Sequence, residues 1–369
     1  MCAVGAWPSQ RLQKLFSIEI PIVQAPMAGA NLAAMAIAVS EAGGLGSLPC
    51  AMLSPDRVRE ELEICRRATS RPINLNFFCH RPPRVDDAVD ERWRQRLVPY
   101  YAELGVDPAG APVASARAPF DERLCAIVEE VRPEVVSFHF GLPDDDLLSR
   151  VRRTGAKVLS SATTVDEARW LEERGCDAIV AQGLEAGGHR GLFLTSDLDT
   201  QLGIAALLPQ IVDAVRVPVI ASGGIADARG IVAALTLGAT GVQLGTAYLF
   251  CPEATISAPH RAALRDRRAP TAVTNVITGR PARGIVNRLI REVGPISTLA
   301  PEFPQAAAAV LPLRAKAEAQ GSGDFSPLWA GQAYPLGREL DAGALTRVLA
   351  DETLACLAAA GSRSHDVGI

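Results

Sequence analysis

Several signals that identify common protein classes are missing from this chain of 369 residues. None of its eight cysteines forms a Cys-x-x-Cys pair, and no basic and hydrophobic leader opens the sequence. The cysteines are therefore expected to be reduced thiols of a cytoplasmic protein. Every long apolar run is broken by glycine, proline or a charge well before about 18 residues, so no membrane-spanning helix is expected.

Signals for nucleic-acid binding and for metal binding are also weak. Aromatic residues make up only 5% of the chain, and the net charge of −4 comes from interspersed charges without a basic tract. Nucleic acid and anionic membranes are therefore not expected partners. Cys50, Cys79 and His80 could suggest a metal site, but no second ligand pair follows at a suitable spacing, so no metal is expected. A Gly-x-Ser-x-Gly elbow and a Walker loop are absent as well.

What the chain does have is a series of eight short apolar runs, most of them followed by a helical pattern. The runs cover residues 22–25, 44–48, 73–78, 135–140, 157–160, 178–182, 217–221 and 241–244. Helices between strands indicate parallel pairing, and runs without polar alternation fit strands that are covered on both faces. The pattern predicts an α/β fold, a (β/α)8 TIM barrel. A doubly wound open sheet is the alternative, although its glycine fingerprint is missing after the first run.

Two stretches depart from this repeat. Residues 81–120 are rich in proline, arginine, aspartate and alanine, and are predicted to form an insertion with a short helix around 92–103. Residues 251–369 are predicted to form a largely helical extension that packs on the barrel, because no linker-like composition separates them from it. The predicted organisation is a barrel over residues 1–250, including the insertion, followed by this C-terminal extension.

The residues that follow each run are candidate site residues, because the active site of a TIM barrel lies at the carboxyl ends of its strands. Met27 lies in a segment of small residues after the first run. Asn74 and Asn76 share one face of the third run, and an amide both donates and accepts hydrogen bonds at the edge of a heterocycle. Taken alone, the segment around Met27 is better explained by a plain strand-to-helix turn, while buried structural amides explain the two asparagines equally well.

The segment after the sixth run, residues 182–191 (QGLEAGGHRG), is the most informative. Its glycines predict a loop whose backbone can wrap an anion. His189 in this loop is a candidate general base, because the unperturbed pKa of histidine lies near neutrality. A solvated loop histidine is the competing interpretation. His139, at the end of the fourth run, is a second candidate, although a hydrogen-bonded core histidine is more common at such a position.

The last two runs carry the signal for a phosphate. Gly223 and Gly224 follow the seventh run, and Gly245 and Thr246 end the eighth. In TIM barrels the loops at these two places frequently bind phosphate through backbone N–H groups and a helix N-terminus. The sequence therefore predicts a phosphorylated ligand.

Five segments together resemble the nitronate monooxygenase family, formerly called 2-nitropropane dioxygenase. They are residues 21–29 (PIVQAPMAG), 74–78 (NLNFF), 182–191 (QGLEAGGHRG), 222–225 (SGGI) and 237–246 (LGATGVQLGT). Residues 278–287 (TGRPARGIVN) and 328–332 (LWAGQ) resemble the helical extension of that family. The resemblance implies non-covalent FMN and the oxidation of alkyl nitronates, such as propionate 3-nitronate, by O2 to carbonyl compounds and nitrite.

The resemblance also implies roles for individual residues. The flavin ring and ribityl chain would contact Met27, Asn76 and Gln182. The phosphate end would contact Gly187, Gly223, Gly224, Gln243, Leu244, Gly245 and Thr246. His189 would hold the nitronate anion as an imidazolium, or take the α-proton of a nitroalkane as a neutral base, and His139 would be a second active-site histidine. The family pattern leads one to expect a threonine or serine near Cys251, so substrate preference can differ here.

Two other functions remain open at this point. One is an FMN barrel that reduces an enoyl thioester or another acceptor with NAD(P)H, since such enzymes share the SGGI and QLGT elements. The other is a flavin-binding barrel without catalysis. The expected partners are a small nitronate and O2, while the sequence leaves open both a homodimer and the use of NAD(P)H.

Overall fold

The computed structural model of the protein describes residues 6–84, 86–107 and 118–365. Its centre is a sheet of eight parallel strands in the order β1-β9-β8-β6-β5-β4-β3-β2. These strands are β1 (Ile22–Gln24), β2 (Gly46–Pro49), β3 (Ile73–Phe78), β4 (Val135–His139), β5 (Lys157–Ala162), β6 (Ala178–Gln182), β8 (Val219–Ser222) and β9 (Gly241–Leu244). A parallel bridge between Val23 and Leu45 joins β1 to β2, and the sheet closes into a barrel.

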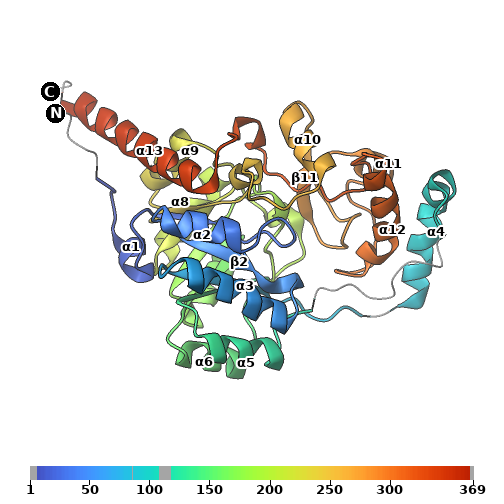
Figure 1. Cartoon of the computed structure of the whole chain (residues 1–369), viewed down its shortest axis with the longest axis horizontal. Coiled ribbons are helices and arrows are strands. Elements are labelled where there is room, and N and C mark those ends of the chain that lie inside the picture. The colour runs from blue at the N-terminus through green and yellow to red at the C-terminus, as the bar shows by residue number, and fades with distance from the viewer. Residues whose placement is uncertain (1–5, 85, 108–117, 366–369) are drawn as a thin grey trace.

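Helices cover the outside of the barrel (Figure 1). They are α2 (Ala33–Glu41), α3 (Pro55–Ala68), α5 (Glu122–Val131), α6 (Asp145–Arg153), α7 (Val165–Glu173), α8 (Ile204–Ala214), α9 (Ala228–Thr236) and α13 (Ala342–His365). Several begin at a residue whose side chain accepts hydrogen bonds from the first turn, including Ser54 for α3, Thr164 for α7 and Asp227 for α9. Such caps satisfy backbone donors that a helix start leaves without partners.

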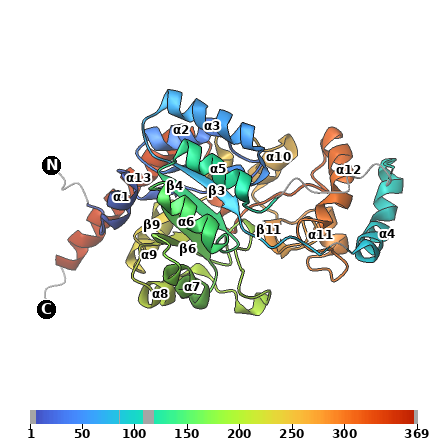
Figure 2. The same cartoon turned by 90° about the horizontal axis from the view of Figure 1, so that it is seen from below.

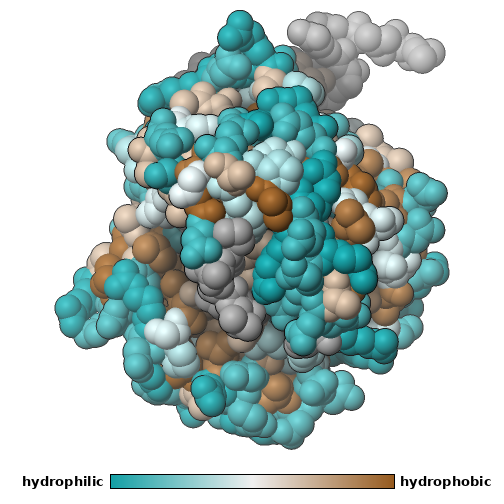
Figure 3. Space-filling model, turned by 90° about the vertical axis from the view of Figure 1, so that its right-hand side faces the viewer, coloured by the Kyte–Doolittle hydropathy of each residue, from teal (hydrophilic) through white to brown (hydrophobic). Residues whose placement is uncertain are grey.

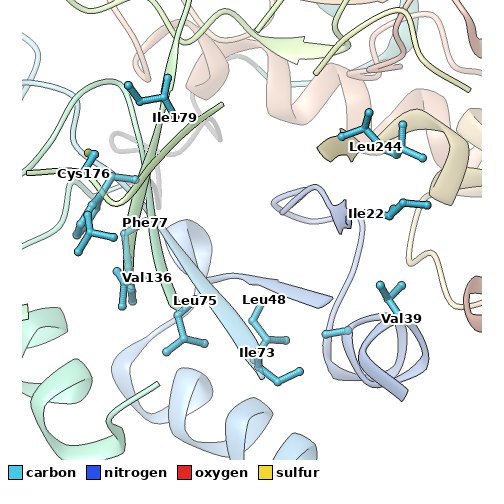
Figure 4. Close-up of a cluster of buried hydrophobic side chains, with 14 of the residues drawn as sticks. Ile22, Val39, Leu48, Ile73, Leu75, Phe77, Val136, Cys176, Ile179 and Leu244 are labelled. Atoms are coloured by element: carbon cyan, nitrogen blue, oxygen red, sulfur yellow. The ribbon is translucent and has the colours of Figure 1, made fainter. Parts of the chain in front are cut away.

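Side chains alternate between the two faces of each strand, and this alternation divides the core into two parts. Ile22, Val136 and Ile179 pack outward against the helices, in the cluster shown in Figure 4. Val23 and Val180 point inward and pack with α1 (Arg11–Phe16), which covers the end of the barrel opposite the carboxyl ends of its strands. This two-residue period decides which side chains of each strand can reach the barrel mouth.

A second group of elements lies at the end of the molecule opposite the chain termini (Figures 1 and 2). It contains α4 (Asp87–Leu104), α10 (Ala258–Asp266), β10 (Thr271–Thr274), β11 (Ala282–Ile285), α11 (Arg288–Val293) and α12 (Ala306–Ala319). Helix α4 packs against α12, and the indole nitrogen of Trp93 donates to the carbonyl of Ala306 at 3.1 Å. The outer surface of this end is mostly hydrophilic (Figure 3).

The predicted TIM barrel is confirmed, and the eight apolar runs match the eight barrel strands to within two residues at either end. Other expectations need correction. The helix expected around 92–103 is longer, because it begins at Asp87, where Asp86 caps it. The extension, which was expected to be largely helical, also contains β10 and β11, which form a second sheet with β7 (Gly188–His189) in the order β10-β11-β7. The division of the chain at residue 250 stays a prediction.

Candidate active site

One cavity of about 490 Å³ lies over the carboxyl ends of the barrel strands. Its size is that of a small-molecule or cofactor site. The end of every barrel strand or the segment that directly follows it contributes to the wall, together with Trp329, Gly331 and Tyr334 from the C-terminal extension. Past Trp329 the cavity continues between α10 and α12, where His260, Arg314 and Glu318 line it.

Most of the predicted site residues lie in the wall of this cavity. They are Met27, Asn76, His139, Gln182, Gly187, His189, Gly223, Gly224, Gln243, Gly245 and Thr246. Leu244 is different, because it is 1% exposed and packs in the hydrophobic layer between barrel and helices. Its neighbours Gln243 and Gly245 face the cavity, so the alternation of β9 turns the Leu244 side chain away.

Glycines form one rim of the cavity, and their geometry fits the phosphate end of a flavin nucleotide. Gly223 and Gly224 have φ angles of 105° and 72°, which side chains rarely adopt. Within the described residues, the backbone N–H groups of Gly224 and Ile225 donate to no protein acceptor. Both residues line the cavity together with Gly245, and backbone donors without a protein acceptor on a glycine-lined rim are suited to an anion.

The inner wall carries polar side chains that are already oriented. The Asn76 side-chain nitrogen donates to the Ser137 hydroxyl at 2.9 Å. The Gln182 amide nitrogen donates to the carbonyl of His189 at 3.0 Å, and its oxygen accepts from the Gly191 N–H at 2.8 Å. The Gln182 amide, predicted as a flavin contact, thus also holds the backbone on either side of Arg190.

His189 lies in a strand and not in a free glycine loop, which corrects the expectation from the sequence. It belongs to β7, which pairs with β11 so that His189 faces Ala282. Its Nε2 lies 2.9 Å from the hydroxyl of Thr278, which is 1% exposed. The centres of the Phe303 and Trp329 rings lie 5.1 and 5.5 Å from the centre of its ring. The imidazole therefore has a fixed place in a largely aromatic pocket.

His139 is held as a neutral imidazole behind His189. Its Nε2 donates to the carbonyl of His189 at 3.3 Å, and its Nδ1 accepts from the Ser161 hydroxyl at 2.6 Å. Burial, together with the nearby charge of Arg280, lowers the pKa of His139 from 6.5 to about 3. Because both ring nitrogens are engaged and the ring is uncharged at neutral pH, this histidine is suited to support β7 more than to transfer protons.

Other residues around the site carry no clear signal in the sequence. Arg190 is fully buried and donates to the carbonyls of Gln182 and Gly183 at 2.8 and 2.7 Å. Burial lowers its pKa to about 10, so the guanidinium is still charged at neutral pH. Phe303 and Trp329 could not be placed beside His189 from the sequence, because the contacts span more than 100 residues. Thr278 lies in the segment TGRPARG, and the resemblance of this segment to the family was the sequence signal that could have pointed to it.

Two buried histidines lead to a prediction about stability in acid. Burial lowers the pKa of His139 to about 3 and that of His260 to about 4, while an unfolded histidine titrates near 6.5. The unfolded chain therefore binds protons that the folded protein excludes, and the free energy of unfolding falls as the pH drops below about 6.5. We expect a lower urea midpoint at about pH 5 than at about pH 7.5, and a smaller difference in His260→Gln. The same pH difference in wild type and His260→Gln would contradict the contribution of His260.

Neither a metal centre nor a membrane span is found in the part of the chain that the structure describes. No group of three or more histidine, cysteine, aspartate or glutamate side chains could hold a metal ion there. None of the helices described there combines the length and the apolar character needed to cross a bilayer.

Comparisons with known proteins agree with this geometry. The model of the nitronate monooxygenase family matches residues 9–352. A nitronate monooxygenase from Pseudomonas aeruginosa is 42% identical over 93% of this chain and 99% of its own length. A nitronate monooxygenase from Paraburkholderia phytofirmans is 42% identical over 92% of this chain and 94% of its own length.

Solved structures extend the comparison to the fold. A nitroalkane oxidase from Streptomyces ansochromogenes superimposes with a TM-score of 0.85 at 38% identity, covering 96% of this chain and 99% of that one. FabK from Thermotoga maritima gives a TM-score of 0.72 at 26% identity, covering 96% of this chain and 98% of that one. The match along nearly the whole sequence shows that this chain belongs to the nitronate monooxygenase family, whose members are flavin-dependent oxidoreductases.

Proposed function

We propose that the cavity binds FMN and that His189 acts on an alkyl nitronate held beside the flavin ring. The observation that carries this proposal is the position of His189, whose imidazole lines the same cavity as the glycine rim and is fixed by a partner at Nε2. Bound flavin supplies the redox chemistry of nitronate oxidation, and the protein supplies orientation and electrostatics.

Different parts of the wall are assigned to different parts of FMN. The phosphate would bind at the N–H groups of Gly224 and Ile225, near Gly245 and Thr246. Asn76 and Met27, on the inner side of the cavity, would contact the ring. Charge-assisted hydrogen bonds to backbone N–H groups require no side-chain reorganisation, so the rim is ready to receive an anion.

His189 would serve the substrate in one of two protonation states. As an imidazolium it would stabilise the negative charge on the nitronate oxygens, and as a neutral imidazole it would take the α-proton of a nitroalkane. Phe78 and Phe140 complete the aromatic surroundings, with ring centres 6.4 and 6.1 Å from that of His189. Because these rings are apolar, we infer that they pack against the alkyl part of the nitronate.

The first experiment is a visible spectrum of the purified protein, followed by acid release and identification of the flavin. We expect FMN at about one per chain, and oxygen uptake with nitrite release when propionate 3-nitronate is added without nicotinamide. A protein that carries no flavin and takes up no FMN would contradict the proposal. Rapid anaerobic bleaching by NADH or NADPH, without nitronate oxidation, would favour the reductase function that the likeness to FabK brings into consideration.

We also propose that the enzyme works in the cytoplasm, and a homodimer stays a prediction from the sequence. The seven cysteines within the described residues are all free, and burial raises the pKa of several of them, so they stay as thiols. Cys2 lies outside the described residues. Sedimentation of the holoenzyme at micromolar concentration tests the dimer, and a single monomer species would exclude it.

A further inference from the structure

The C-terminal extension holds the strand that carries His189. Strand β11 pairs with β7 in antiparallel register, with Ala282 opposite His189 and Arg283 opposite Gly188. The N–H of Arg190 donates to the carbonyl of Pro281 at 2.8 Å. Since β7 is only two residues long, this pairing and the Gln182 and His139 side chains together fix its backbone. The extension is thus part of the wall that positions the imidazole.

The same extension also reaches the side chain of His189. Strands β10 and β11 pair with Thr274 opposite Ala282, and the connection between them contains Thr278. The Thr278 hydroxyl lies 2.9 Å from Nε2 of His189 and 3.5 Å from the carbonyl of Arg280. Thr278 is 1% exposed, so its oxygen is shielded from water.

The roles of donor and acceptor follow from the two partners of Thr278. We infer that the hydroxyl hydrogen points toward the Arg280 carbonyl, which can only accept, and that the hydroxyl oxygen accepts from the Nε2–H of His189. A neutral His189 then carries its lone pair on Nδ1. An acceptor at Nε2 also stabilises the imidazolium, because the charged ring donates from both of its nitrogens.

Other charged or titratable groups lie near His189. His139 lies behind its carbonyl and is neutral at pH 7, because its pKa is lowered to about 3 by burial. Arg190 is the next residue of the chain, and Arg280 stacks its guanidinium 4.0 Å from the centre of the Phe140 ring. His80, after β3, packs against the same aromatic rings. The charges of these two arginines lower the pKa of the neighbouring His139.

We propose that Thr278 is a positioning residue of the reaction, which sets the tautomer, the direction and the basicity of the His189 imidazole. This inference rests on the proposed role of His189. Threonine and valine have nearly the same shape, so Thr278→Val removes the acceptor while it preserves the packing. Thr278→Ser keeps the hydroxyl and serves as the matched control.

The test compares wild type and both variants as FMN-loaded enzymes across pH. With a neutral nitroalkane as substrate, Thr278→Val should lower kcat/KM by about 10-fold to 100-fold, which is the effect of losing a hydrogen bond to a charged group. The apparent pKa of the basic group in the pH profile should fall, and KM for a preformed nitronate should rise. Thr278→Ser should restore the pH profile to that of wild type. A purely structural role would change flavin content or Tm without moving this pKa.

Two results separate this inference from the proposed function. If Thr278→Val keeps the wild-type pH profile and kcat/KM while His189→Asn is inactive, Thr278 has no positioning role and the function of His189 stands. If His189→Asn is fully active, the proposed function itself fails. Nitrogen NMR of the wild-type holoenzyme provides a test that needs no folded Thr278 variant, with the His189 signals assigned from His189→Asn. A neutral Nε2–H tautomer is expected, and a dominant Nδ1–H tautomer would overturn the proposal.

Discussion

Replacement of His189 by asparagine is expected to lower the rate of nitronate oxidation by about 100-fold or more, while FMN stays bound. A positioned acid or base contributes a factor of this size, and an amide neither carries a positive charge nor takes a proton near neutral pH. The bound flavin should be retained, because Gly223, Gly224 and Gly245 form the rim and their backbone does not depend on the imidazole. Oxygen uptake at saturating nitronate, normalised to flavin absorbance, measures the effect.

A second histidine of the same cavity offers a matched control. His260 is also buried, and its Nε2 donates to the carbonyl of Trp329 at 3.1 Å, but it lies past Trp329 on α10. His260→Asn should therefore cost much less activity than His189→Asn. Equal losses in the two variants would indicate a general disturbance of the cavity. An unchanged rate in His189→Asn would remove the imidazole from the reaction.

The barrel was predictable because each of its strands is a local signal. The runs at 73–78, 178–182 and 241–244 coincide with β3, β6 and β9, since strands buried on both faces are largely apolar and lack a regular polar alternation. Asn76 and Gln243 were placed in the cavity wall by the same reasoning, because the site of a barrel lies where its strands end. The reasoning fails for the side chain of Leu244, because side chains alternate along a strand and the neighbours of a wall residue therefore point away from the cavity.

The surroundings of His189 could not be predicted, because they depend on pairing between distant segments. Strand β7 has only two residues. It is a strand because it pairs with β11, which lies about 95 positions later in the chain. Glycines at 187, 188 and 191 suggest a loop, and no local pattern shows that such a segment is paired. Thr278 and Phe303 reach the imidazole through the same long-range packing. The chemistry of the site was therefore visible in the sequence, while the elements that orient its imidazole were not.

Gly187 offers the sharpest test of the flavin cradle, because its replacement by alanine meets backbone and not side chains. A Cβ at this position would lie 2.5 Å from the nitrogen of Gly331 and 2.6 Å from the carbonyl carbon of Ala330. The N–H of Gly331 also donates to the Thr246 hydroxyl at 3.0 Å, at the place where the phosphate is proposed to bind. Because backbone cannot rotate away, Gly187→Ala must force the two sides of the rim apart, at a cost of about 1–3 kcal/mol.

We expect Gly187→Ala to lose most of its FMN on gel filtration and to unfold at a temperature a few degrees lower than wild type. Gly323→Ala is the matched control, since a Cβ there makes only ordinary contacts with Leu328 and Pro259, and the position is not part of the cavity wall. Neither glycine requires a left-handed backbone, so the comparison isolates the steric clash from conformational strain. If Gly187→Ala retains one flavin per chain and has the same Tm as Gly323→Ala, the rim accommodates the added methyl group. The phosphate must then bind elsewhere. If only Gly187→Ala loses flavin, the closeness of residues 187 and 331 is what shapes the cradle.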